Sequence, residues 1–147
     1  MNTKLFEHFN AEDAHSLGEA MRAEAVANNL PIVIDIREGD TPLYSVLLPG
    51  ATAENFDWAR RKRNLALLTK QDTWSHGQRR LEGHDILDEL GLDVRDYASH
   101  GGCIPVFLSG SVLAATVTVS GLPQKEDHEL VLKHLTELWH KQQKEIA

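Results

Sequence analysis

Apolar and polar positions alternate in two pairs of short segments along the chain. Isoleucine stands at every second position from Ile32 to Ile36, with Val33 and Asp35 between, which is typical of a strand. Turn-forming residues at 39–42 separate this segment from a second apolar run, and Ser109-Gly110 separates two later runs in the same way. The sequence therefore predicts two antiparallel hairpins. Their strands are 31–38 with 43–48, and 103–108 with 112–119.

The segments around these hairpins carry apolar residues at helical spacing. Asn10 with Asp13 forms a capping-box signal at the start of the first helix, and Ser75 with Gln78 forms another before a helix that Gly91 ends. The predicted helices are 10–28, about 53–70 after the cap residue Thr52, about 75–91, and a last one from Pro123 on.

The order of elements, α-β-β-α-α-β-β-α, predicts an α+β fold in which two hairpins form an antiparallel sheet flanked by helices. A doubly wound parallel sheet does not fit this order. Residues 96–102 are read as a loop, and a fifth strand is expected near 92–98. The 147 residues suit a single domain, 1–147.

The helix predicted over 53–70 places polar residues inside its apolar stripe. With Trp58 set at zero, about 100° per residue puts Leu65, Ala59 and Ala66 on one side of the helix. Lys62 at about +40° and Asn55 at about +60° fall within that stripe. On the same wheel Arg60 and Arg63 point away from the stripe, and Arg61 flanks it.

Lys62 has two interpretations. Its stem can be buried while the ammonium group reaches water at the edge of the helix, the commoner arrangement for lysine. The ammonium can instead point into a pocket, where it would need a carboxylate, phosphate or carbonyl partner.

The loop at 99–103 is a second candidate for chemistry. Gly101 and Gly102 allow close approach of a ligand or a sharp turn before a strand. His100 is either a ligand or general base, or a loop histidine beside the turn, which is the commoner case. Cys103 is either a nucleophile or, more often at such a position, a small buried residue.

The remaining composition narrows the classes of function. Apolar residues make up 41% and charged residues 25% of the chain, as in globular proteins, and the net charge of −7 argues against nucleic-acid binding. The run Arg60-Arg61-Lys62-Arg63 spreads around its helix and is read as a solvated face. Cys103 is the only cysteine, and the spacing of the eight histidines fits no zinc motif, so no metal site is expected.

No segment is apolar enough to cross a bilayer, and the N-terminal residues do not look like a signal peptide. We therefore expect a cytoplasmic protein without membrane partners.

Three stretches resemble a known family. They are Asn55-x-x-Trp58-Ala59-x-x-Lys62-x-Asn64, then His100-Gly101-Gly102-x-x-Pro105, then Val119-Ser120-Gly121-Leu122-Pro123 followed by Asp127-His128. In this order and spacing the chain resembles the HbpS/GlcG-like haem-degrading-domain family, within its uncharacterised protein family 0303 branch, from about residue 12 to 140. The branch usually has Ser-Phe where this chain has Cys103-Ile104.

The resemblance implies a profilin-like α/β/α sandwich, homo-oligomers and, in some relatives, a bound haem or corrinoid. It favours a cytoplasmic oligomer that binds a small or flat anionic ligand, with haem as a candidate. The expected ligand-binding residues are Asn55, Trp58, Lys62, His100, Gly101 and Gly102. Two alternatives remain open: a haem-degrading enzyme with His100 or Cys103 as iron ligand, and a non-enzymatic assembly module.

Overall fold

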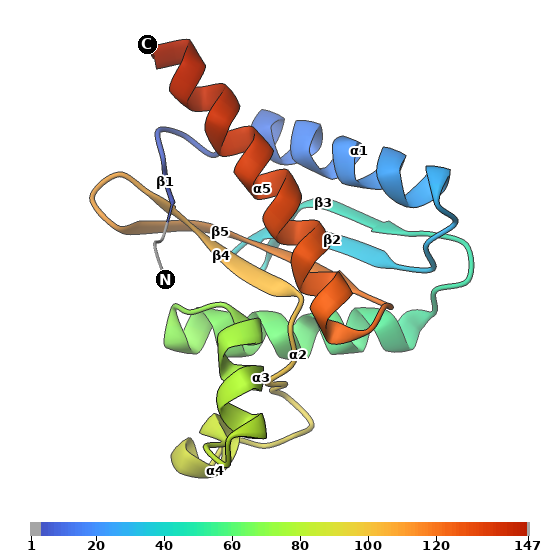
Figure 1. Ribbon diagram of the computed structural model, residues 1–147, viewed down its shortest axis with the longest axis vertical. Helices are drawn as coiled ribbons and strands as arrows, with labels where there is room; N and C mark the ends of the chain where they lie inside the picture. The colour runs from blue at the N-terminus through green and yellow to red at the C-terminus, as the bar shows by residue number, and fades with distance from the viewer. Residues whose placement is uncertain (1–3, 147) are drawn as a thin grey trace.

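The protein forms one five-stranded sheet with helices on both faces (Figure 1). The computed structural model describes residues 4–146. The strands are β1 (Leu5–Phe6), β2 (Val33–Glu38), β3 (Thr41–Leu47), β4 (Cys103–Leu108) and β5 (Val112–Ser120). The helices are α1 (Ala11–Ala27), α2 (Ala53–Thr69), α3 (Thr73–Leu81), α4 (Ile86–Leu90) and α5 (Gln124–Ile146).

The order of strands in the sheet is β1-β4-β5-β2-β3. The hairpins β2–β3 and β4–β5 are joined by antiparallel pairing of β2 with β5, in which Asp35 lies opposite Thr118. Helices α1 and α5 cover one face of the sheet, α2 covers the other, and α3 with α4 extends beyond α2 (Figure 1). The predicted α+β sandwich built on two hairpins is confirmed.

Strand β2 is buried on both faces, which explains its composition. Ile34 and Ile36 belong to the core beneath α1 and α5, together with Val117 and Val119 of the neighbouring strand. The other face carries Asp35, which is also buried and meets side chains of α2. Apolar residues on one face and Asp35 on the other explain why the sequence alternates although Val33–Ile36 are all buried.

The fifth strand is not where the sequence placed it. Residues 92–98 form turns and loop, and the additional strand is β1, which pairs parallel to β4 through Leu5 opposite Phe107. With two residues, β1 is too short to show an alternating pattern. The sheet is therefore antiparallel except at this edge.

The helix expected over 75–91 is two helices. Asp72, not Ser75, caps α3, because its carboxylate accepts a hydrogen bond from the Ser75 backbone N–H at 2.8 Å. Gly83 then adopts a φ of +94°, a left-handed conformation that stops the helix. Asp85 caps α4, which ends at Gly91 as predicted.

Candidate functional site

A pocket of about 230 Å³ opens between α2, the loop before β4 and the connection from β5 to α5. It brings together four of the six residues that the sequence singled out, although up to 45 positions separate them along the chain. The lining residues are Asn55, Trp58, Lys62, His100, Ser120, Gly121, Leu122, Gln124 and Asp127. We call this the Lys62 pocket.

Lys62 is buried, so it does not reach water as a snorkelling lysine would. Only 3% of the residue is exposed, and its ammonium group donates to an Asp127 carboxylate oxygen at 3.1 Å and to the Val119 carbonyl at 3.2 Å. Asp127 also accepts a hydrogen bond from the Leu122 backbone N–H at 3.0 Å. Helix α5 and the turn before it thus supply the carboxylate partner that a buried lysine requires.

Burial disfavours both charges of this pair. Desolvation lowers the pKa of Lys62 and raises the pKa of Asp127 to about 6, and the attraction between the two groups opposes both shifts. The ammonium group has three N–H bonds, and within residues 4–146 two of them are used, by Asp127 and Val119.

Gly101 and Gly102 are buried, and their role in the structure is close packing. A Cβ at Gly102 would overlap the Val119 carbonyl oxygen and lie 2.7 Å from the Lys62 Nζ, and its φ of +141° favours glycine. A Cβ at Gly101 would lie 2.7 Å from the Gln124 carbonyl oxygen. Neither glycine lines the pocket, so the pair acts by letting the loop approach Lys62 and α5.

His100 also lines the pocket. Its ring meets the Trp58 ring edge-on, with 5.3 Å between centroids, and the Arg61 guanidinium lies 4.1 Å over the same indole. Burial is the main cause that lowers the pKa of His100, and the charges of Arg80, Lys62 and Arg61 lower it further. The imidazole is therefore neutral at pH 7 in electropositive surroundings.

Asn55 has a capping role that the helical wheel did not show. Its side-chain oxygen accepts a hydrogen bond from the Thr52 backbone N–H at 2.9 Å, at the first turn of α2. Within residues 4–146 the amide nitrogen of Asn55 forms no side-chain hydrogen bond, and the side chain lines the pocket.

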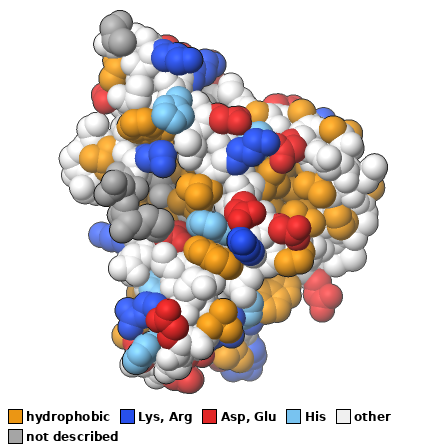
Figure 2. All heavy atoms as spheres, in the orientation of Figure 1, with side chains coloured by type: hydrophobic (Ala, Val, Ile, Leu, Met, Phe, Trp, Pro, Cys, Tyr) orange, Lys and Arg blue, Asp and Glu red, His pale blue; other side chains and the backbone are white. Residues whose placement is uncertain are grey.

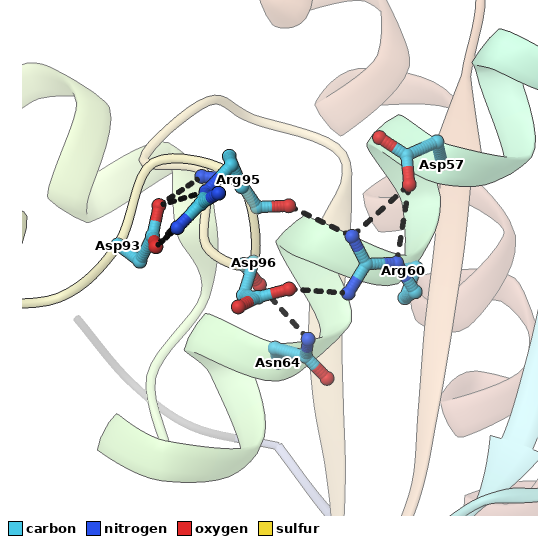
Figure 3. Close-up of polar contacts among 6 residues, drawn as sticks. All are labelled: Asp57, Arg60, Asn64, Asp93, Arg95 and Asp96. Atoms are coloured by element: carbon cyan, nitrogen blue, oxygen red, sulfur yellow. Dashed lines mark hydrogen bonds and ion pairs between the residues drawn. The ribbon is translucent and has the colours of Figure 1, made fainter.

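The loop that carries His100 is anchored at its start by α2 (Figure 3). Arg60 bonds to the Asp96 carboxylate at 3.0 Å and to the Arg95 carbonyl at 2.7 Å, and Asn64 donates to the Asp96 carbonyl at 2.8 Å. At its far end the Gly101 N–H donates to Gln124 at 3.1 Å. These bonds at both ends fix where His100 stands relative to Lys62.

Arg63 does not point away from the protein, which corrects the expectation from the wheel. Its guanidinium reaches through to the sheet and meets the Asp35 carboxylate at 3.0 Å, which Arg37 also binds at 2.9 Å. The basic run of α2 therefore divides into a half-buried Arg60, an Arg61 stacked on Trp58, and two buried cations, Lys62 and Arg63. Figure 2 shows acidic and basic side chains interspersed on the visible face, without a basic stripe.

Cys103 lies at the start of β4 and is fully buried. Burial raises the pKa of its thiol to about 12, so the reactive thiolate is strongly disfavoured. Cys103 is a small core residue, as its position suggested, and it does not line the Lys62 pocket.

The described residues also bear on two further possibilities, a metal site and a membrane-spanning helix. Within residues 4–146, no group of three His, Cys, Asp or Glu side chains is placed to hold a metal ion. In the same range, no helix has the length and apolar character that crossing a bilayer demands.

The three stretches that carried the family resemblance converge on the Lys62 pocket. Each supplies wall residues: Trp58 and Lys62 from the first, His100 from the second, Asp127 from the third. Sequence reasoning missed the pairing of Lys62 with Asp127, because the latter looked like an ordinary acidic residue in a first helical turn. It also missed Gln124, for which the sequence gives no signal.

Comparison with known proteins agrees with this convergence. Residues 9–136 match the family described as "Haem degrading protein HbpS-like". A UPF0303 protein of Azotobacter vinelandii is 41% identical over 143 residues, covering 97% of this chain and 86% of the relative. One from Paraburkholderia phymatum is 43% identical over 132 residues, covering 89% and 80%.

Two solved structures share the fold. The crystal structure of Ybr137w protein has a TM-score of 0.84 at 25% identity and covers 98% of this chain and 84% of its own. The crystal structure of a PduOC:heme complex has a TM-score of 0.72 at 18% identity and covers 87% and 93%. The second shows likeness of fold alone.

Proposed function

The chain belongs to the HbpS-like haem-degrading family, and from this premise we propose that it binds a small or flat anionic ligand in the Lys62 pocket, with haem as the first ligand to test. The observation that carries the proposal is the charge around His100. Three cations, Arg61, Lys62 and Arg80, act on a neutral imidazole at the wall of a pocket. Asp127 balances the charge of Lys62, so the positive charge that favours an anion comes from Arg61 and Arg80 beside the pocket.

In this proposal each lining residue makes a different contact with the ligand. Lys62 offers its remaining N–H to the anionic group, Asn55 offers its amide nitrogen, and Trp58 supplies an aromatic surface for a flat ligand. Gly101 and Gly102 bring the loop close enough to close the pocket.

The side chains of the Lys62 pocket suit haem chemically, but the pocket is small for a whole haem. A neutral imidazole is an iron ligand, and cations suit the carboxylates of a porphyrin. Yet 230 Å³ is below the roughly 300–1,000 Å³ of pockets that enclose drug-sized ligands. One chain would therefore hold only an edge of haem, and a second copy would have to cover the rest. A small organic anion fits without that help.

Titration with hemin tests the proposal and separates the two ligand classes. A shifted Soret band that His100→Ala abolishes supports haem bound through His100. Cys103→Ala serves as the matched control, because its thiol is buried and should leave the spectrum unchanged. Free-hemin spectra at every protein concentration, together with no small anion found by native mass spectrometry of the purified protein, would refute the proposal.

A further inference from the structure

A second hollow lies on the other side of the first turn of α5. It has a volume of about 380 Å³, within the range of sites that enclose small organic ligands, and shares no lining residue with the Lys62 pocket. We call it the β4-edge groove.

The groove exists because β1 is short. Its two residues pair with Phe107 and Leu108, so the first half of β4 has β5 on one edge and no described strand on its outer edge. Ile104 and Pro105 of this uncovered half line one wall, and Leu132 and Leu135 of α5 line the other. Leu132 is 39% exposed in consequence.

The rim of this apolar groove is cationic. Lys4 and Lys70 line it, and neither forms an ion pair within residues 4–146. Asp72 is the one acid in the lining; its carboxylate is engaged as the cap of α3, where Ser75 donates to it from N–H and hydroxyl at 2.8 and 2.9 Å. The groove thus carries a net positive charge in an acidic protein.

His128 provides an independent sign of a ligand. Only 7% of it is exposed, its ring stacks on Trp74 with 5.5 Å between centroids, and it lines the groove. Its Nδ1 is buried without a hydrogen-bond partner in the described part of the chain. A buried imidazole is usually hydrogen-bonded, so this one suits a ligand that brings its own polar group.

We propose that the β4-edge groove binds an amphipathic carboxylate, with its apolar body between β4 and α5 and its anionic head at Lys70 and His128. The apolar walls exclude a small inorganic anion as the preferred ligand, and the lysines disfavour a neutral or cationic one. This site is separate from the Lys62 pocket and does not depend on the function proposed there.

Calorimetric titration with decanoate tests the inference. We expect one decanoate per chain with an affinity tighter than about 1 mM, and weakening of about tenfold in Lys70→Glu, which reverses a charge at the rim. Leu132→Glu should weaken binding at least as much. The matched controls are Lys141→Glu and Val26→Glu, exposed positions that do not line the groove; they should stay within about twofold of wild type.

Two further measurements test whether the apolar body of the ligand is needed and whether it binds beside His128. Acetate, which has the head without the body, should show no saturable binding, and the ring protons of His128 should shift in NMR spectra when decanoate is added. No saturable decanoate binding, equal weakening in the control variants, or acetate binding as tight as decanoate would overturn the inference. Hemin titration of Lys70→Glu reports on the Lys62 pocket separately, so either proposal can fail alone.

Discussion

Lys62 and Asp127 place opposite charges 3.1 Å apart in the interior of the protein, where removing one charge strands the other. We expect Lys62→Met to lower the free energy of unfolding by roughly 3–5 kcal/mol at pH 7.5, because an uncompensated carboxylate stays buried. Urea denaturation measures this. Helix geometry alone left a snorkelling lysine open, and that arrangement would have cost less than about 1 kcal/mol.

The double variant Lys62→Met, Asp127→Leu is the control for this prediction. It removes both charges, so its stability should lie closer to wild type than that of the single variant. The loss in Lys62→Met should also shrink near pH 5, where the pKa of Asp127, about 6 with Lys62 present, allows protonation. A single variant as stable as wild type would show that the pair contributes nothing.

His76 provides a prediction about pH. It is 3% exposed, its Nε2 lies 2.9 Å from the Thr69 hydroxyl, and burial lowers its pKa below 6.5. The unfolded chain therefore takes up a proton first as the pH falls, so this residue contributes stability above pH 6.5 that is lost as the pH falls through the folded pKa.

His76→Gln removes this proton uptake. Below pH 6.5 the wild type should lose stability faster than the variant, by up to about 1.4 kcal/mol per pH unit. Urea denaturation from pH 8 to pH 5 gives both curves. Parallel curves would mean that His76 titrates alike in the folded and unfolded chain.

Helix α2 joins its layer to the sheet through charge as well as through apolar contact. Arg63 bonds to Asp35 in the interior strand β2, while Arg60, three residues earlier, makes its ion pairs at the surface. We expect Arg63→Met to destabilise by roughly 3–5 kcal/mol, since a buried carboxylate loses one of its two partners.

Arg60→Met is the matched variant on the same helix and should cost about 0–1 kcal/mol. Thermal or urea unfolding of the two variants side by side measures the difference. Equal losses would mean that Arg37 alone satisfies Asp35, whose carboxylate it also binds.

The elements differ in how far the sequence predicted them, for physical reasons. Both hairpins, α1 and α2 follow from alternation, helical spacing and caps, which are local signals. Strand β1 has little local signal, because a strand of two residues shows no alternation. The break at Gly83 was missed because the sequence pattern predicts one helix from about Ser75 to Gly91. Arg63 was misplaced because a helical wheel assigns charge to solvent, while the partner that buries it, Asp35, is 28 residues away.

The last helix, α5, shows the same limit of local sequence patterns. Trp139 is only partly buried, and its Nε1 donates to the Leu5 carbonyl at 3.0 Å, a partner 134 residues away along the chain. Leu130 is 6% exposed and belongs to the core. Helix α5 packs against β5, which directly precedes it, and against α1, which lies far away in the sequence.

At the scale of the whole molecule, the two edges of the sheet are unlike. The β4 edge is partly covered by β1, whereas β3, with seven residues, pairs only with β2 among the strands described. An uncovered strand of this length exposes backbone N–H and C=O groups that can pair with another chain. The proposed homo-oligomer would cover this edge, and it would also give haem the second surface that one chain lacks.

Light scattering at low micromolar concentration tests that association. We expect a mass that is a multiple of 16.4 kDa for the wild type, and a smaller mass for Leu47→Lys, which puts a charge on an exposed position of β3. Val26→Lys, on the exposed side of α1, is the control and should keep the wild-type mass. A wild-type monomer would remove the oligomer, whereas an oligomer that both variants keep would place its interface away from β3. If Leu47→Lys gives a monomer that still binds a small anion but no longer binds hemin, the second copy is needed only for the larger ligand, as the volume of the Lys62 pocket implies.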